Sequence, residues 1–188
     1  MRIVAYHGTD MSVAKNIVNT KFICKDNKEH WLGDGIYFYP DLSLARWWTS
    51  NPTSKFGVTV EKPAIIKCDI EIDEDRVLNL SELSGFTKYI EQINDFFGVA
   101  LSDRRRPLER IDYKKFRCAF FNYVFLRNEV DLIIAPFSTA SQPYFPISKN
   151  KTLFEHMNIM YTEMQICLRE DCQDVIIAKN IIGGECDD

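Results

Sequence analysis

The sequence has no long hydrophobic run, no cysteine framework and no closely spaced metal ligands. Its 188 residues contain no apolar stretch of the length that a membrane span needs, and the apolar part of residues 1–7 is too short for a signal peptide. We therefore expect no membrane association and a cytoplasmic location. Of the six scattered cysteines only Cys167 and Cys172 lie close together, whereas disulfide frameworks are typical of shorter secreted chains. We therefore expect reduced thiols. The three histidines are far apart in sequence, so we also expect no metal site.

An excess of positive charge is absent as well. The formal net charge is −4 at pH 7, which gives no general argument for binding to nucleic acid or to a lipid surface. The sequence does have a hydrophobic content of 46%, enough for a sizeable core in a chain of this length. We expect a single domain over residues 1–188.

The most informative stretch is Trp31-Leu-Gly-Asp-Gly-Ile-Tyr-Phe38. Two glycines flank an acidic residue directly before an apolar and aromatic run, which predicts a tight turn that leads into a strand. Alternation in that strand puts Tyr37 and Tyr39 on one face and the residues between and before them on the other. Tyr37 would then be either an ordinary core aromatic or a flat platform for stacking on a ligand ring.

The remaining patterns favour an α+β fold with mostly antiparallel strands. A first strand leads to His7, and a helix follows that Asp10 or Ser12 would cap. The middle of the chain, about 81–128, has the periodicity of two amphipathic helices. Further expected elements are a strand over 36–39, a helix after Pro40-Asp41, a strand over 63–72, and three late strands over 131–137, 161–169 and 174–182.

The late strand over 161–169 has an unusual polar face. Alternation places Glu163 and Gln165 side by side, opposite mostly apolar neighbours. The two side chains would point either into water or into a cleft. In a cleft a carboxylate can stabilise positive charge or accept a proton.

Three pieces in this order resemble a known family: His7-Gly8-Thr9 after the first strand, Gly35-Ile36-Tyr37-Phe38 before a helix, and Glu163 on a late strand. The set is similar to the ADP-ribosyltransferases of the His-Tyr-Glu type, which include diphtheria toxin and the poly(ADP-ribose) polymerases. The resemblance implies strands that split around an NAD cleft, here with a helical insertion at about 81–128. It also implies that His7 bonds the adenosine ribose, that the backbone of Gly8 holds the nicotinamide carboxamide, and that Thr9 helps to fix the dinucleotide.

The same resemblance implies roles for the aromatic and acidic residues. Tyr37 would stack on the nicotinamide and Trp48 would close the other side of the ring, with Trp47 one position away from that register. Glu163 would be the catalytic glutamate that bonds the hydroxyls of the nicotinamide ribose, and His7 and Tyr37 would complete the catalytic set. Gln165 lies on the same strand face, so it either contributes to NAD binding or holds the position of the glutamate itself.

The activity that the resemblance implies is transfer of ADP-ribose from NAD to a nucleic acid or protein, with release of nicotinamide. Small stand-alone enzymes of this kind are often bacterial toxins, paired with an antitoxin or used in defence against phage. Two alternatives stay open: an inactive NAD- or nucleotide-binding module of the same fold, and an NAD-dependent RNA phosphotransferase. The latter would need several basic residues around the cleft.

Residues 104–117 form the most basic segment, with seven basic residues against two acidic ones. The segment is either a solvated helix face or a patch that docks a nucleic acid backbone, an acidic protein or an acidic antitoxin.

Overall fold

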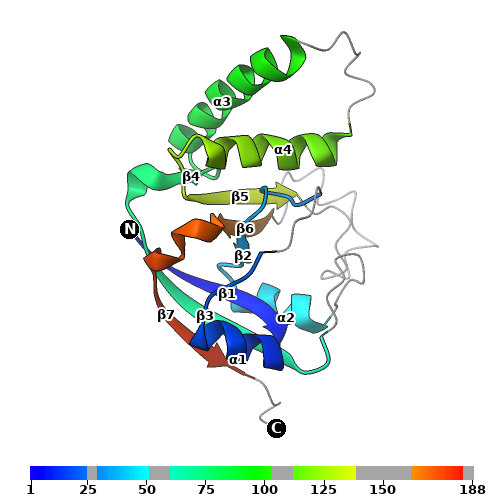
Figure 1. The fold of residues 1–188 in the computed structure, drawn as a ribbon, viewed down its shortest axis with the longest axis vertical. Coiled ribbons are helices and arrows are strands. Elements are labelled where there is room, and N and C mark those ends of the chain that lie inside the picture. The colour runs from blue at the N-terminus through cyan, green and yellow to red at the C-terminus, as the bar shows by residue number, and fades with distance from the viewer. Residues whose placement is uncertain (25–28, 51–59, 103–111, 139–161, 184–188) are drawn as a thin grey trace, which may run out of the picture.

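The computed structural model describes residues 1–24, 29–50, 60–102, 112–138 and 162–183 (Figure 1). The helices are α1 (Met11–Asn19), α2 (Leu42–Ser50), α3 (Leu83–Ser102) and α4 (Tyr113–Leu126). The strands are β1 (Arg2–Asp10), β2 (Ile36–Phe38), β3 (Pro63–Glu71), β4 (Val77–Asn79), β5 (Leu132–Ser138), β6 (Thr162–Leu168) and β7 (Ile176–Ile182). Short 3-10 helices cover Glu74–Arg76 and Glu170–Val175.

The strands form two sheets, with the orders β1-β3-β7 and β2-β6-β5-β4. All pairs are antiparallel except β4 with β5, which is parallel. The α+β class and the mostly antiparallel pairing are therefore confirmed. The sequence patterns did not predict β4, which lacks the glycine turn and the aromatic run that mark the equally short β2.

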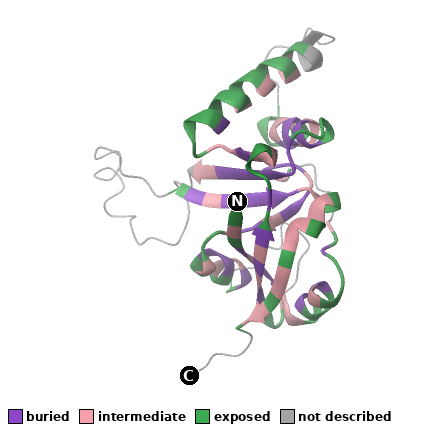
Figure 2. Ribbon diagram, turned by 90° about the vertical axis from the view of Figure 1, so that its left-hand side faces the viewer, coloured by how far each residue is buried: buried purple, intermediate pink, exposed green. Residues whose placement is uncertain are grey.

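The elements stack in layers, which Figure 1 shows from top to bottom. Helices α3 and α4 cover the side of the four-stranded sheet that faces away from β1, β3 and β7, while α1 and α2 lie on opposite sides of the three-stranded sheet. Much of α3 is exposed (Figure 2). The two helices lie within the predicted helical middle of the chain.

Two hydrophobic clusters hold these layers together. The first lies between the sheets and includes Phe38 of β2, Ile66 of β3 and Ile166 of β6. The second joins the four-stranded sheet to the helices and includes Phe120 of α4 and Cys167 of β6. Successive residues of β6 thus belong to different clusters, so both faces of that strand are buried.

Of the two residues that the sequence offers as the N-cap of α1, Asp10 holds that position. Its Oδ1 accepts a hydrogen bond from the backbone of Ser12 at 2.9 Å, and its Oδ2 accepts from the backbones of Glu61 and Lys62 at 3.0 and 2.9 Å. The bond from Lys62, followed by those from Ser12, holds the pKa of Asp10 well below its usual range. The N-cap also fastens the start of β3 to the end of β1.

Candidate functional site

His7 lies near the end of β1, and its side chain is tied to β2. Its Nδ1 atom lies 2.8 Å from the carbonyl oxygen of Tyr37. The ring packs edge-on against Phe22 and Phe38, with ring-centre distances of 5.1 and 6.0 Å. Burial lowers the pKa of His7 and outweighs the opposing effect of the bond to Tyr37, so the ring is neutral at pH 7. Because a carbonyl oxygen can only accept, Nδ1 carries the proton and Nε2 is an acceptor.

The two sheets are linked where β2 changes its partner. Tyr37 pairs with β6, but two residues later Tyr39 exchanges two backbone hydrogen bonds with Tyr6 of β1, each of 2.8 Å. In a continued antiparallel ladder the next such pair would join Gly8 to Tyr37. The His7 ring bonds the Tyr37 carbonyl instead. The backbone amide and carbonyl of Gly8 therefore face the edge where β1 and β2 separate.

Helix α2 packs directly against Gly8. A Cβ atom at this position would lie 2.8 Å from the carbonyl oxygen of Ala45 and 2.8 Å from Cγ2 of Thr49. It would also lie 3.4 Å from Cε3 of Trp48. Only glycine allows so close an approach of strand and helix. Trp48 is thus beside Gly8, although its partly buried ring lies on a different element from Tyr37.

Tyr37 has its hydroxyl group inside the turn that precedes it. The hydroxyl accepts a hydrogen bond from the backbone of Leu32 at 2.7 Å and donates to the carbonyl of Gly33 at 2.8 Å. Burial, and then the neighbouring Cys167, raise the pKa of Tyr37 well above its usual value, so the phenol keeps its proton. Gly33 has φ of 81°, in the left-handed region that favours glycine. Only the ring of Tyr37 is left to contact a ligand.

Glu163 and Gln165 are both buried, with exposed fractions of 2% and 9%. Gln165 donates its side-chain amide to Oε1 of Glu163 at 2.8 Å, while Oε2 is buried and has no hydrogen-bond partner among the described residues. Of the two alternatives for this strand face, exposure to water is therefore wrong. A buried carboxylate oxygen without a partner is unfavourable for folding and suggests a position kept for a ligand.

The register of the sheet shows which candidates share a face. Tyr37 lies opposite Cys167, so its side chain is on the same side of the sheet as Gln165 and Glu163. The ring of His7 instead contacts residues of the cluster between the sheets. The fold thus brings Tyr37 and Glu163 to one face, and joins His7 to the main chain of Tyr37 rather than to its ring. Thr9, 5% exposed, follows two residues after His7 on the same side of β1.

The sequence patterns missed three residues of this face. Trp31 packs on Phe137 with ring centres 4.5 Å apart, and the guanidinium carbon of Arg117 lies 5.1 Å from the Trp31 ring and 5.7 Å from the Phe137 ring. Phe137 of β5 is the cross-strand partner of Glu163. Helical spacing contained a signal for Arg117, because it precedes the buried Phe120 of α4 by three residues.

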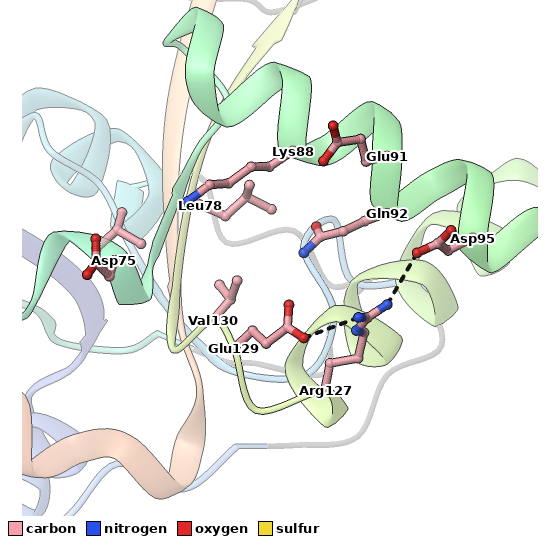
Figure 3. Close-up of a pocket in the computed structure, with 10 residues that line it drawn as sticks. Asp75, Leu78, Lys88, Glu91, Gln92, Asp95, Arg127, Glu129 and Val130 are labelled. Atoms are coloured by element: carbon pink, nitrogen blue, oxygen red, sulfur yellow. Dashed lines mark hydrogen bonds and ion pairs between the residues drawn. The ribbon is translucent and has the colours of Figure 1, made fainter.

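A pocket of about 330 Å³ lies elsewhere, between α3, β4 and the end of α4 (Figure 3). Its lining includes Gln92, Asp95, Arg127 and Glu129, and Arg127 pairs with both carboxylates, at 3.4 Å to Asp95 and 3.1 Å to Glu129. None of its lining residues belongs to the His7, Tyr37 and Glu163 set. Among the described residues, three buried side-chain polar atoms have no hydrogen-bond partner: Gln92 Oε1 lines this pocket, and Arg117 Nε and Glu163 Oε2 are at the sheet face. We place the candidate site on the sheet face, because it has two of these atoms and the separated backbone edge.

Some predicted features cannot be compared with the structure. The basic residues Arg104, Arg105, Arg106 and Arg110 lie outside the described residues. Within the described part, the three-residue clusters of His, Cys, Asp or Glu that a metal ion needs are absent, and no helix has the length and apolar character of a membrane span.

Comparisons with known proteins add one relative. The chain is 27% identical over 184 residues to MJ0359, an uncharacterized protein of Methanocaldococcus jannaschii, and the match covers 90% of this chain and 83% of that protein. No protein-family model matches the chain. No solved structure matches it either.

Proposed function

We propose that this protein transfers ADP-ribose from NAD to a macromolecular acceptor, a nucleic acid or a protein, and releases nicotinamide. The observation that carries the proposal is the side chain of Glu163, a buried carboxylate with one oxygen to which no donor in the described part of the chain bonds. A group that a folding chain keeps in so unfavourable a state is a candidate for function.

The geometry around β2 supports an ADP-ribosyltransferase-like fold. Two sheets diverge at this strand, and the backbone of Gly8 offers a donor and an acceptor at the edge where they separate. A carboxamide needs one acceptor and one donor, so Gly8 suits the nicotinamide amide. Nε2 of the neutral His7 can accept a hydrogen bond from a ribose hydroxyl, while the ring of Tyr37 and Trp48 beside Gly8 are aromatic surfaces for the nicotinamide.

The reaction asks for one well-placed carboxylate. The bond between C1′ of the ribose and the nicotinamide nitrogen breaks, and its electron pair leaves with nicotinamide. Positive charge grows at C1′, as in glycoside hydrolysis. An oxygen or nitrogen atom of the acceptor then forms a bond to C1′ and loses its proton. Oε2 of Glu163 would accept a hydrogen bond from the ribose, stabilise the growing charge and receive that proton.

The biological setting follows from the same proposal. Small ADP-ribosyltransferases that act alone are often bacterial toxins. The proposal therefore includes a role as a toxin that is paired with an antitoxin, or a role in defence against phage. The identity of the acceptor is the open part of the proposal. It would be found by measuring the intact mass of candidate targets after incubation with NAD.

The decisive experiment is replacement of the carboxylate by its amide. Glu163→Gln should lower the rate of nicotinamide release from NAD about 10²–10³-fold, because a preorganised electrostatic group is lost, while NAD affinity changes little. Gln165→Ala should have a milder effect. The matched control is Glu71→Gln, an exposed carboxylate of β3 that pairs with Arg2 at 2.9 Å. The control should keep full activity.

Two results would contradict the proposal. One is a wild-type protein that neither releases nicotinamide nor modifies any acceptor. The other is a Glu163→Gln variant with normal activity. If Gln165→Ala is inactive and Glu163→Gln is active, Gln165 holds the key position on the strand and Glu163 is not the catalytic glutamate.

A further inference from the structure

Arg117 is a cation that two aromatic rings hold in place. Its guanidinium carbon lies 5.1 Å from the ring of Trp31 and 5.7 Å from the ring of Phe137. Its Nε atom is buried, and no described residue forms a hydrogen bond with it. Stacking on rings satisfies the faces of a guanidinium group but not the N–H groups at its edge. Arg117 is therefore fixed in position with at least one donor free.

Its neighbours on α4 differ from it in this respect. The side chain of Lys115 pairs with Asp112 at 3.2 Å, and Lys114 pairs with Glu29 at 3.8 Å. Both lysines are exposed, whereas Arg117 faces the sheet. The basic residues of this segment therefore differ in their surroundings. Lys114 and Lys115 are paired surface charges, whereas Arg117 is partly buried against two aromatic rings.

Arg117 and Glu163 flank the same phenylalanine. Phe137 is the cross-strand partner of Glu163, and cross-strand side chains on one face lie about 5 Å apart at Cβ. The guanidinium group and the carboxylate are therefore separated by on the order of 10 Å, by that spacing and the reach of the side chains. One has a buried donor without a partner, and the other a buried acceptor without a partner.

A ligand that satisfies both groups carries hydroxyl donors next to an anion. A ribose with its 5′-phosphate has this arrangement, because its hydroxyls can bond a carboxylate while the phosphate bonds an arginine fork. Neutral nucleosides and nicotinamide lack the anion. The chemistry at this face therefore favours a nucleotide over a nucleoside.

We propose that Arg117 binds the diphosphate of NAD while Glu163 contacts the ribose of the nicotinamide half. The proposal rests on the function proposed above and adds a residue that selects the dinucleotide. An arginine held on two rings loses little conformational freedom when the phosphate arrives, so its hydrogen bonds are favourable for binding.

The test compares NAD with nicotinamide riboside, which lacks both the diphosphate and the adenosine of NAD. Calorimetry would measure the Kd of NAD and of nicotinamide riboside for the wild type, Arg117→Met and Arg117→Lys. Met keeps an apolar stem against the rings and removes the charge, so NAD affinity should fall by about tenfold or more. Riboside affinity should stay unchanged. Lys keeps the charge without the fork, so its NAD affinity should fall between the other two.

The matched control removes a positive charge from the same helix without touching the rings. Lys115→Met should bind both ligands like the wild type. Thermal unfolding of every variant would show that each is folded under the conditions of the binding experiment.

Different failures have different meanings. Equal weakening of NAD and riboside by Arg117→Met would assign Arg117 a structural role and overturn the proposal, as would unchanged NAD affinity. If the wild type binds NAD through Arg117 but releases no nicotinamide, the proposed transferase activity falls and the binding role of Arg117 stands. A wild type with no affinity for NAD would overturn both.

Discussion

Two buried carboxylates lie at opposite ends of the pair of strands β5 and β6, and their surroundings differ. Asp131, 8% exposed, directly precedes β5 and bonds Arg76 through both oxygens, at 2.8 and 2.6 Å. It also pairs with Arg169 at 3.2 Å. Glu163 is more deeply buried, at 2%, and receives a single bond from the neutral amide of Gln165.

The difference separates a structural charge from a candidate functional one. Burial raises the pKa of Asp131, but its hydrogen bond to Arg76 and the charge of Arg169 outweigh burial, and the net pKa lies below the usual value. The carboxylate is thus stabilised in the native protein, where it joins the segment before β4 to the end of β6. The described residues around Glu163 supply no cation of this kind.

The largest expected effect on stability comes from breaking the paired carboxylate. Asp131→Asn should lower the free energy of unfolding by about 2–3 kcal/mol. This is at or below the lower end of the range for breaking a buried ion pair, because the side chain of Arg76 is 35% exposed and water screens its charge. Glu163→Gln should leave that free energy equal or higher, because it removes an uncompensated buried charge. Denaturation in urea measures both.

This comparison fails if the two variants behave alike. A loss of 2 kcal/mol or more in Glu163→Gln would mean that the carboxylate supports the fold, contrary to its contacts. The Glu71→Gln variant is again the control for removal of a carboxylate, and its exposed pair with Arg2 should contribute less than about 1 kcal/mol.

A smaller effect on stability is expected from changes to Tyr37. Its hydroxyl group supports the turn, and its ring is the part proposed to stack on NAD. Tyr37→Phe removes the bonds to Leu32 and Gly33 and should lower the free energy of unfolding by about 1 kcal/mol, with NAD affinity unchanged. Tyr37→Leu also removes the ring, and NAD affinity should fall several-fold, since aromatic stacking contributes about 0.5–1.5 kcal/mol. Calorimetry would measure the Kd of NAD for both variants and so distinguish the effect of the hydroxyl group from that of the ring. Equal affinity of the Phe and Leu variants would exclude stacking on this ring.

Much of the fold was accessible from local patterns. The alternation in β2 and β6 correctly assigned Tyr37 and Glu163 to faces, because a period of two leaves no choice once the strand is known. The patterns narrowed the N-cap of α1 to two residues, and the structure shows Asp10 in that position, where it accepts from the backbone of Ser12. Its further bonds to residues 61 and 62 could not be predicted, because those residues are distant in sequence. The parallel strand β4 was not predicted, because its three residues have neither a glycine turn nor an aromatic run beside them.

The candidate site was predicted in its composition but not in its geometry. The patterns named Glu163 and His7, yet they could not show that the His7 ring turns toward Phe22 and bonds a main-chain carbonyl. That orientation depends on where β2 leaves β1, which is a property of two sheets. The contacts of Arg117 also depend on tertiary packing, because Trp31 and Phe137 come from distant segments.

His7 is a third buried titratable group. Unlike the carboxylates of Asp131 and Glu163, its ring needs no opposite charge nearby while it is neutral. Burial lowers its pKa, so the unfolded chain binds a proton more readily than the folded protein does. The stabilisation is therefore complete above the unfolded pKa of about 6.5 and is lost as pH falls below it. Stability should therefore fall as the pH drops below about 6.5, with a slope from this one group of at most about 1.4 kcal/mol per pH unit.

The measurement is the free energy of unfolding at pH 8, 7, 6 and 5 for the wild type and His7→Gln. The amide can keep a bond to the Tyr37 carbonyl but does not titrate, so the variant should lose less stability on acidification than the wild type does. The control is Ile17→Val, a buried change with a small loss of stability that should keep the wild-type slope. Parallel pH profiles of wild type and His7→Gln would mean that His7 stays accessible to protons in the folded protein. The Nε2 acceptor proposed for the adenosine ribose would then be charged in mild acid, and NAD binding should weaken there without any loss of the fold.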